Sequence, residues 1–563
     1  MAKWNRNGEN LAMWVDALYR GRFVTFDPER PSCSLLAVSG GRVVAAEEDA
    51  EGLEARVRED FGAASIWPGF HDAHCHTAAF GLGLTELNLS TPPISTMNDL
   101  YDAVAEAALA LGPNDWVIGS GYDQNKLGGT HPSRRRLDEA AGGRPVWLKH
   151  TSGHMCFANS AVLAMIGPKL AAPIDGGRLQ FGVGGQPTGL FEERAQALVQ
   201  ELRPARSLDQ LAEAIDRAHR VYLSEGLTSV CEAGVAGGWV GQSPLELGAY
   251  QLARDTARLG VRTTAMISAA VLHDVGARPS DALAAALDAG IRTGLGDEWL
   301  RIGALKVFSD GSLIGRTCWM HDGFEDDPGN TGYPQADPAE MKETIIGAHC
   351  AGWQVSTHAI GDAAVDFALE CYSAALQAQS RPDHRHRIEH CGVASDAAVT
   401  SMAAMGVIPV PQGRFIGEIG DGMAAALGQA RVPQTYRLRS FIDAGLGLPA
   451  SSDRPVVDGR PLLGIRDMVC RLTQSGEPFG TAEALSPTEA LFAYTVGSAY
   501  ASRCDDERGR LTPGMLADFV VLADDPRSVP PADLGAIPIV ATVLGGEVVF
   551  RSADAWAARP RSI

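Results

Sequence analysis

The feature that most constrains the fold is an alternation of apolar, strand-like runs with helical stretches across residues 68–507. The alternation begins just after IWPGFHDAHCH, a strand-like run at residues 66–76. Seven later runs have the same character: LTSVCEAG, RTTAMISA, IGALKVFSDGS, WQVSTHAIGD, HRIEHCG, VIPVPQG and LGLPASSD. Eight strands in this alternation predict an α/β fold, a TIM-type (β/α)8 barrel. The chemistry of such a barrel lies at the carboxyl ends of its strands.

Helix signals support the alternation. The stretch TMNDLYDAVAEAALALG repeats apolar residues at helical spacing, and Thr96 and Asp99 at its start form a capping-box pattern. The stretch SLDQLAEAIDRAHRVYLSEG begins in the same way, with Ser207 and Gln210. Both stretches are therefore predicted to be amphipathic helices.

The spacing of polar residues predicts an insertion. A barrel allots roughly 30 residues to each β/α unit. His390 follows His358 by 32 residues, which is one unit, but Lys306 follows His76 by 230 residues, far more than three units supply. We expect residues 113–206, which are rich in Gly and Pro, to be an inserted segment. Such a segment is expected to lie over the barrel mouth and to form a substrate lid.

The two ends of the chain have a different character. Residues 1–67 and 508–563 contain short strand-like runs and turns, with Gly40-Gly41 and Gly545-Gly546 placed as in two-residue hairpins. We expect the two ends to form one composite β-sandwich beside a barrel at residues 68–507. Two separate β-tails are the alternative, but they would leave strand edges uncovered.

Polar residues gather at the ends of five predicted strands. Two histidines on alternate positions of the first strand share one face. Taken singly, each polar residue has a structural explanation, such as a satisfied core histidine or a helix cap. Together they predict a divalent metal site, because borderline ions such as zinc prefer imidazole and carboxylate ligands. The candidates are His74, His76, Lys306, His358, His390 and Asp453.

Composition excludes several classes of partner. The net charge is −20, and the longest basic run is Arg134–Arg136. This argues against nucleic acid and anionic membranes, which need a basic face, and says little about a small-molecule substrate. The ten cysteines show no C-x-x-C pair, and no apolar stretch is long enough to span a membrane. With no secretory signal pattern at its start, the protein is expected to be cytoplasmic.

The motifs, taken in order, resemble the amidohydrolase superfamily, and more narrowly its family 3 branch, which includes N-substituted formamide deformylases. The resemblance spans nearly the whole chain and implies both the barrel and the composite sandwich. A homodimer is plausible for a family of this size. The motifs are PGFHDAHCH, RPVWLKHTSGHMCFANSAVL, PTGLFEE, ALKVFSDGSLIGRT, THAIGD, RIEHC, SSDRPV and GRLTPGMLADFVVL.

The resemblance implies a role for each candidate ligand. His74 and His76 would bind one ion together with Asp453, and His358 and His390 would bind a second. The ions are expected to be Zn²⁺. Because some relatives use a single metal, their number, one or two, remains open.

Lys306 would carry CO₂ on its amine, and the resulting carbamate would bridge the two ions. An unmodified lysine has no acceptor and cannot ligate metal. The simpler alternative is a strand-end cation paired with Asp310.

Other polar residues receive secondary roles. Asp72 is expected to orient a metal-ligating histidine. His154, in SGHMCFAN, is a candidate substrate-binding residue because the resemblance places that segment over the pocket. Glu192 and Glu193 are weaker candidates, since a charged pair opening a helix usually forms a solvated face. His71 replaces a more usual hydrophobic residue and is expected to pack away from the metal side. The remaining histidines are expected to be structural.

The predicted reaction is hydrolysis of a non-peptide C–N bond of amide type in a small molecule. Metal-activated hydroxide would attack the carbonyl carbon, and Asp453 would shuttle the proton to the leaving nitrogen. Two alternatives stay open: a deaminase on the same scaffold, and a catalytically silent barrel kept for binding. The substrate itself is not specified by these motifs, because fold alone does not assign function.

Overall fold

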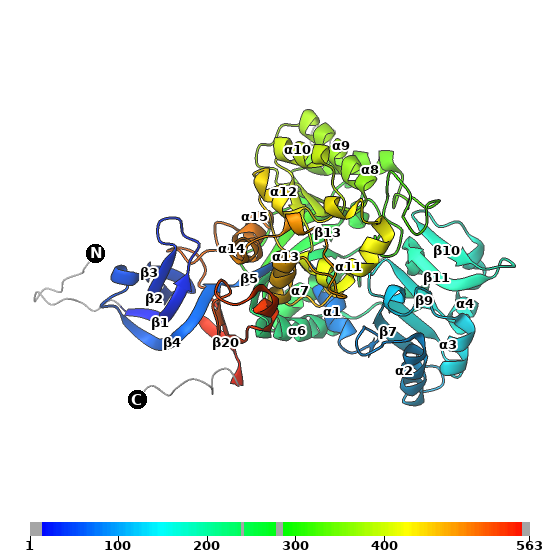
Figure 1. The fold of residues 1–563 in the computed structure, drawn as a ribbon, viewed down its shortest axis with the longest axis horizontal. Coiled ribbons are helices and arrows are strands. Elements are labelled where there is room, and N and C mark those ends of the chain that lie inside the picture. Colours follow the sequence, from blue (N-terminus) through cyan, green and yellow to red (C-terminus); the bar gives the residue numbers. More distant parts are fainter. Residues whose placement is uncertain (1–13, 238–240, 277–284, 554–563) are drawn as a thin grey trace, which may run out of the picture.

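The computed structural model describes residues 14–237, 241–276 and 285–553, which form three sheets and their helices (Figure 1). The barrel lies in the middle, with one sheet on each side of it. None of the described helices is long and apolar enough to cross a membrane.

The central sheet is parallel and has seven strands in the order β17-β16-β15-β14-β13-β12-β5. Seven of the eight predicted strands therefore occupy the expected positions. They are almost entirely buried, which explains their continuous apolar sequence. Their bounds are β5 (Phe70–Cys75), β12 (Leu227–Val235), β13 (Arg262–Ser268), β14 (Leu300–Phe308), β15 (Val355–Ala359), β16 (Arg387–His390) and β17 (Ile408–Val410).

The eighth predicted strand, LGLPASSD, is not a regular strand, and that part of the prediction is wrong. Pro449 lacks an N–H, and Asp453 has a positive φ of 58°, so an even ladder cannot form. The segment nevertheless lies beside β5. The backbone N–H of Ala73 donates to the carbonyl of Ala450 at 3.0 Å, and that of Asp453 donates to His74 at 2.7 Å. These bonds close the barrel between its first and last segments.

Helices surround this sheet. Both predicted capping boxes are present, one at α6 (Leu208–Ser224) of the barrel and the other at α2 (Met97–Leu109), which packs on the inserted sheet. Helix α6 packs against α1 (Thr77–Gly83) and α7 (Glu246–Asp255). The later helices are α8 (Pro338–Cys350), α9 (Asp362–Ala378), α10 (Asp396–Met405), α11 (Gly413–Leu427), α12 (Leu438–Asp443), α13 (Pro461–Cys470), α14 (Pro487–Phe492) and α15 (Ser498–Ala501).

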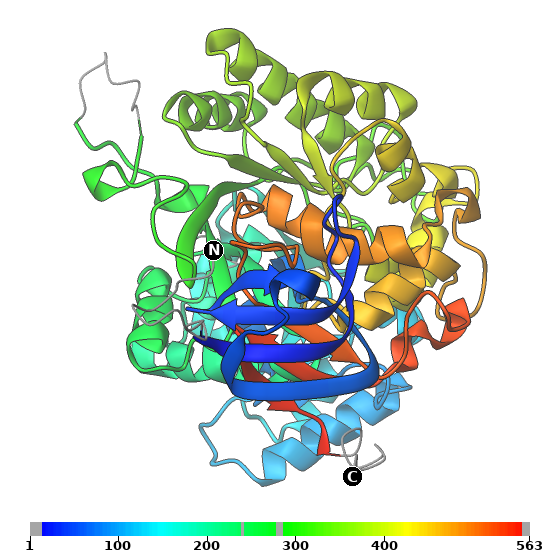
Figure 2. The same cartoon turned by 90° about the vertical axis from the view of Figure 1, so that its left-hand side faces the viewer.

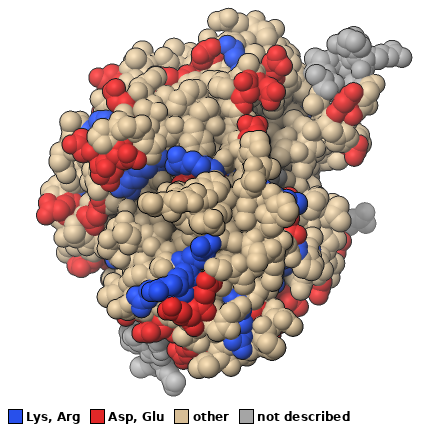
Figure 3. All heavy atoms as spheres, turned by 90° about the vertical axis from the view of Figure 1, so that its right-hand side faces the viewer, with Lys and Arg blue, Asp and Glu red and all other residues tan. Residues whose placement is uncertain are grey.

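The inserted segment forms its own six-stranded sheet, in the order β10-β11-β9-β8-β7-β6. It lies at the right of Figure 1, and Figure 3 shows that side, where acidic and basic side chains are mixed. The sheet comprises β6 (Leu87–Asn88), β7 (Val117–Tyr122), β8 (Val146–His150), β9 (Met155–Ala158), β10 (Gly177–Phe181) and β11 (Pro187–Glu193), with α3 (Arg134–Ala140), α4 (Ser160–Ile166) and α5 (Ala197–Gln200).

This layer begins earlier than residue 113. Leu100 and Val104 of α2 share a hydrophobic core with Val117 and Leu148 of the inserted sheet. The helical pattern of α2 was visible in the sequence, but periodicity does not say which sheet an amphipathic helix covers.

The third sheet combines both chain ends, in the order β20-β19-β18-β4-β1-β2-β3, and faces the viewer in Figure 2. Gly40-Gly41 and Gly545-Gly546 form the two predicted hairpin turns, with φ from 57° to 76°. The domain boundaries at residues 67 and 508, and the sandwich, stay predictions. The strands are β1 (Trp14–Val24), β2 (Ser32–Ser39), β3 (Arg42–Ala46), β4 (Glu54–Pro68), β18 (Phe519–Leu522), β19 (Ile539–Leu544) and β20 (Glu547–Arg551).

Candidate metal centre

The carboxyl ends of the barrel strands open into one cavity of about 1900 Å³, including the part open to solvent. All the predicted ligands line this cavity, although they come from segments nearly 400 residues apart in the chain. All but one of them are buried; the side chain of His76 is 16% exposed. The ligands that line it are His74, His76, Lys306, His358, His390 and Asp453.

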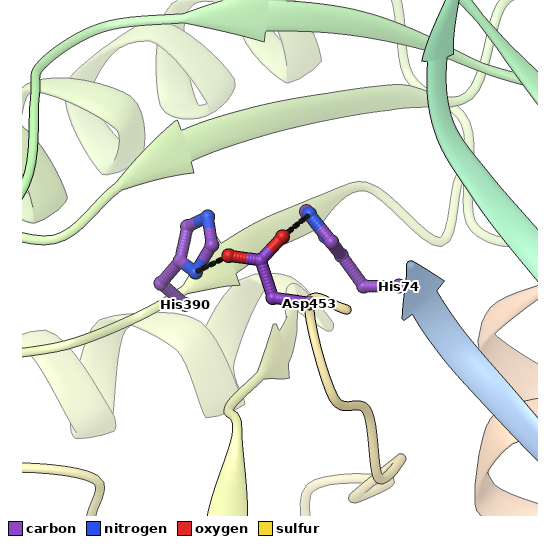
Figure 4. Close-up of side chains that lie close together, drawn as sticks. All are labelled: His74, His390 and Asp453. Atoms are coloured by element: carbon purple, nitrogen blue, oxygen red, sulfur yellow. Dashed lines mark ion pairs between the residues drawn. The ribbon is translucent and has the colours of Figure 1, made fainter. Parts of the chain in front are cut away.

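The carboxylate of Asp453 lies among His74, His76 and His390, and Figure 4 shows it between His74 and His390. Its Oδ1 is 3.3 Å from Nε2 of His74 and 3.1 Å from Nε2 of His76, and its Oδ2 is 4.0 Å from Nδ1 of His390. His74, His390 and Asp453 each offer one ligand atom within 4.8 Å of the others. Burial alone would raise the pKa of Asp453, but the adjacent imidazoles of His74 and His76 hold it well below its usual range.

Two of these candidates have left-handed backbone, with φ of 67° at His390 and 58° at Asp453. Such a conformation costs a residue with a Cβ atom about 1–3 kcal/mol, and it persists where surrounding contacts fix it. At Asp453 those contacts include the bond from its backbone N–H to His74. The strain therefore coincides with the cluster of ligand atoms.

Asp72 does not orient an imidazole, and that expectation is wrong. Its Oδ1 accepts the backbone N–H of His74 at 3.0 Å and that of Ser452 at 3.1 Å, and its Oδ2 accepts the hydroxyl of Ser452. It joins the first and last segments of the barrel instead.

The orienting groups come from other segments. Oε2 of Glu389 accepts from Nδ1 of His74 at 2.5 Å, and Oε1 of Gln412 accepts from Nδ1 of His390 at 2.8 Å. The Glu232 carboxylate lies 3.8 Å from Nδ1 of His76. A partner on Nδ1 leaves the Nε2 lone pair to face a metal.

Glu389 is the orienting residue that the sequence could have suggested, because it directly precedes His390 in RIEHC. Burial would raise its pKa, but the adjacent Arg387 guanidinium holds it well below the usual range. The Nε of Arg387 donates to Oε1 of Glu389 at 2.7 Å. A fully buried carboxylate thus stays ionised beside a candidate metal ligand.

His358 lies outside the compact cluster. Its ring centroid is 4.4 Å from that of His390, but its Nε2 donates to the Gly311 carbonyl at 3.1 Å. Nδ1 is then the atom left to ligate. Burial holds the pKa of His358 well below its usual value, which favours the neutral imidazole that metal ions require.

Lys306 is buried, and its Nζ has no hydrogen-bond partner among the described residues; it lies 4.8 Å from the Phe308 ring centroid. Burial lowers its pKa to about 8. The alternative pairing with Asp310 is not formed, because that carboxylate accepts backbone N–H groups of Ile360 and Gly361. A buried amine without a hydrogen-bond partner, next to neutral imidazoles and an ionised carboxylate, fits a metal-binding donor set.

The inserted layer adds a histidine to this cavity. Nδ1 of His154, just before β9, lies 2.7 Å from Oε2 of Glu193 at the end of β11. Burial would lower the pKa of His154, but the Glu193 carboxylate raises it above the usual value. Glu192 and Glu193 are both buried, so the solvated-face interpretation is wrong. Both belong to a buried strand, and Glu192 pairs with Arg178.

The other histidines have protein partners. His71 contacts the hydroxyl of Ser502 at 3.2 Å, and His219 of α6 accepts the backbone N–H of Gly260 at 3.1 Å. His150 differs from the expectation in its position, because it lines the large cavity, where it contacts Ser152.

Among relatives, the protein LONG AFTER FAR-RED 3 of Arabidopsis thaliana is 29% identical over 94% of this chain and 90% of its own length. The N-substituted formamide deformylase of Arthrobacter pascens is 27% identical over 93% of this chain and 96% of its own length.

Solved structures share the fold. An uncharacterised metal-dependent hydrolase from Pyrococcus horikoshii has a TM-score of 0.72 at 24% identity, covering 92% of this chain and 99% of that one. The atrazine chlorohydrolase TrzN of Arthrobacter aurescens, complexed with zinc, has a TM-score of 0.52 at 15% identity, covering 95% of each chain. These likenesses confirm the predicted TIM-type barrel. The model of the amidohydrolase family matches residues 63–550, and the chain therefore belongs to this family of hydrolases.

Proposed function

We propose that the protein hydrolyses a non-peptide C–N bond of amide type in a small molecule, with Asp453 as the proton carrier. The observation that carries the proposal is the position of the Asp453 carboxylate. It lies within 3.3 Å of two imidazole nitrogens, on the wall of a cavity that can hold a small molecule. A metal ligand that also faces the cavity can contact both the attacking water and the leaving nitrogen.

The donor set would hold one or two divalent ions, and its imidazoles and carboxylate favour zinc. A bound ion supplies Lewis-acid chemistry, since it polarises a carbonyl and makes water more acidic. Lys306 takes part as a carbamate formed with CO₂, which supplies the acceptor atoms that an amine lacks. The proposed ligands are His74, His76, Lys306, His358, His390 and Asp453.

Asp453 then moves one proton. As a carboxylate it accepts a proton from the attacking water while the bond from water oxygen to carbonyl carbon forms. It delivers that proton to the nitrogen as the C–N bond breaks, so the products are a carboxylic acid and an amine. The adjacent imidazoles of His74 and His76 hold the pKa of Asp453 low, so the carboxylate is ionised at neutral pH and can accept a proton.

His154 positions the substrate from the opposite layer. Its Nδ1–H is held by Glu193, so the ring presents its other edge to the cavity that it lines. In its protonated form, which Glu193 favours, the ring donates a hydrogen bond from Nε2 to the substrate carbonyl oxygen.

The experiment that tests the function combines metal analysis with a substrate panel. Purified protein is expected to hold about one or two zinc ions per chain and to release amine from simple amides. Protein without stoichiometric metal would favour the silent barrel, and ammonia release from aminated heterocycles would favour the deaminase. A cytoplasmic location, a homodimer and the absence of nucleic-acid and membrane partners stay predictions.

A further inference from the structure

The large cavity extends from the candidate metal centre along helix α1. This helix begins directly after His76, and Leu84 is its C-cap. At a rise of about 1.5 Å per residue, Leu84 lies roughly 12 Å along the helix from His76. Four residues at positions i, i+1, i+4 and i+5, which form one face of a helix, line the cavity: Ala79, Phe80, Gly83 and Leu84.

This face of α1 presents apolar surface to the cavity. The side chain of Leu84 is 47% exposed, and Phe80 is partly buried. Trp147 of β8, in the inserted layer, also lines the cavity and is partly buried. Exposed apolar surface inside a binding cavity is stabilised when an apolar group of a ligand covers it and removes it from water.

Gly83 leaves room beside this surface. Its backbone is helical rather than left-handed, so the conformation does not require a glycine. A Cβ atom built at Gly83 would meet no heavy atom within 4 Å outside the local helix backbone. Because Gly83 lines the cavity, the space that a side chain would occupy is available to a ligand.

Charged groups in the cavity wall already have counter-ions. Apart from the proposed metal ligands, each carboxylate, ammonium or guanidinium group among the described residues of this wall forms an ion pair within the protein. The pairs are Lys149 with Glu86 at 2.7 Å, Arg414 with Glu418 at 2.8 Å, and Arg454 with Asp458 at 3.2 Å. An ionised substrate group would have to displace one of these partners or lose its hydration without compensation, whereas an uncharged group would not.

Resting on the proposed function, we propose that the substrate carries a bulky, uncharged, apolar group and that the face of α1 binds this group. Leu84 contacts the group, and Gly83 provides the space for it. The distance from His76 to Leu84 fits a substituent as long as a substituted benzyl group rather than a methyl group.

The test uses the zinc-loaded, full-length protein and amides that differ in one group. The first series comprises N-(4-methylbenzyl)acetamide, two analogues in which a carboxylate or an aminomethyl group replaces the ring methyl group, and N-methylacetamide. A second series carries the same rings on the acyl side. In at least one series, kcat/KM of the wild type should be at least about tenfold higher for the neutral ring compound than for the other three, since even one buried methylene can contribute that much.

Gly83→Leu fills the space beside the apolar surface of α1. It should lower kcat/KM for the neutral ring compound at least about tenfold and leave that of N-methylacetamide nearly unchanged. Leu84→Asp should raise kcat/KM of the aminomethyl analogue relative to the neutral compound, because it adds a carboxylate that can pair with the substrate. The matched control is Gly347→Leu in α8, where a Cβ atom would also meet no neighbouring atom within 4 Å but would lie outside the cavity wall.

A second readout needs no turnover. Binding of 4-methylbenzyl alcohol, a neutral ring without a scissile C–N bond, is measured by calorimetry on the zinc-loaded wild type and variants. Gly83→Leu should raise its dissociation constant at least about tenfold, and Gly347→Leu should not. If the wild type cleaves no amide, the proposed function fails, whereas the binding data still decide the role of the α1 face. Charged analogues cleaved as well as the neutral ring compounds, or unchanged ring binding in folded Gly83→Leu protein, would overturn the inference.

Discussion

The imidazole of His154 donates its Nδ1–H to the fully buried carboxylate of Glu193, with 2.7 Å between the two atoms. Both residues belong to the inserted layer, yet His154 lies against the barrel, where its ring centroid is 4.9 Å from that of His358. The insertion therefore contributes a side chain to the site. It supplies a polar group of fixed orientation to the cavity that the barrel ligands line.

Glu193→Gln is expected to lower kcat/KM by at least about tenfold, as loss of an orienting partner typically does. Because the neutral amide holds His154 less firmly, KM should rise while zinc content stays normal. Glu192→Gln is the matched control, since the neighbouring carboxylate pairs with Arg178, a half-exposed residue. Steady-state kinetics and metal analysis of both variants check the prediction. Equal effects of the two substitutions would remove Glu193 from a positioning role.

His74→Ala and His358→Ala are expected to lower bound zinc and to abolish hydrolysis, with the larger loss of metal in His74→Ala. The reason is that His74 belongs to the compact cluster with Asp453, whereas Nε2 of His358 bonds to Gly311. Elemental analysis of dialysed protein measures the difference.

His219→Ala is expected to change neither metal nor activity, but that residue is buried in α6 and its loss lowers stability. His321→Ala is therefore added as an exposed control. Similar zinc contents in all four variants would show that the ligand assignment is wrong.

The sequence predicted the candidate ligands better than their partners. His74, His390 and Asp453 each lie at the end of a strand-like run, so topology alone places them at one end of the barrel. Gln412 and Glu232 also lie near the ends of strand-like runs, but their contacts with the ligands depend on how separate segments pack. The polar strand ends were visible in the linear sequence, whereas the hydrogen bonds between them were not.

The predictions were wrong where tertiary packing determines the burial or the conformation of a segment. Glu193 follows a short apolar run and precedes a helical stretch, a pattern typical of a solvated helix start, and only the packing of β11 buries it. The sequence predicted helix α2 and its capping box, but not that the helix packs on the inserted sheet. The segment ending at Asp453 has the composition of a strand, yet Pro449 and the left-handed residue prevent a regular ladder.

His219 offers a pH prediction away from the metal centre. Burial lowers its pKa to about 3, against 6.5 in the unfolded chain, so only the unfolded state gains a proton as pH falls below 6.5. The contribution of His219 to the free energy of unfolding is therefore fully present above pH 6.5 and is lost as the pH falls below it. The loss is about 1.4 kcal/mol between pH 7.5 and 5.5.

His219→Asn removes the titration and keeps an oxygen that can accept the N–H of Gly260. Between pH 7.5 and 5.5, the free energy of unfolding in urea should therefore fall by about 1.4 kcal/mol less in this variant than in the wild type. An identical pH dependence in the two proteins would contradict the burial argument.

Deletion of residues 515–563 is expected to give insoluble protein. The deletion removes β18, which pairs with β4. In this pairing Phe519 lies opposite Pro68, and Leu522 lies opposite Ser65. The freed edge of β4 would expose unpaired backbone groups and adjoining apolar side chains, which favours aggregation. Expression followed by fractionation measures the outcome, and a soluble, fully active truncation would contradict the dependence of the N-terminal strands on the C-terminal ones.

Asp453→Asn separates proton transfer from metal binding. The amide keeps the shape and one acceptor oxygen of the carboxylate but cannot accept a proton at neutral pH. The other proposed ligands remain, so the variant should hold at least one metal ion. Its kcat should still fall by at least about 10², the lower end of what general acid–base catalysis contributes.

Lys306→Ala is expected to behave differently, because it removes the proposed bridging anion together with the amine. It should lose metal along with activity, and a short carboxylic acid added to the assay should restore part of both. The same acid should not rescue Asp453→Asn, whose defect is the missing proton acceptor. Zinc analysis and kcat, each measured with and without the acid, distinguish the two variants. An Asp453→Asn enzyme with full metal and near-normal kcat would remove Asp453 from the mechanism.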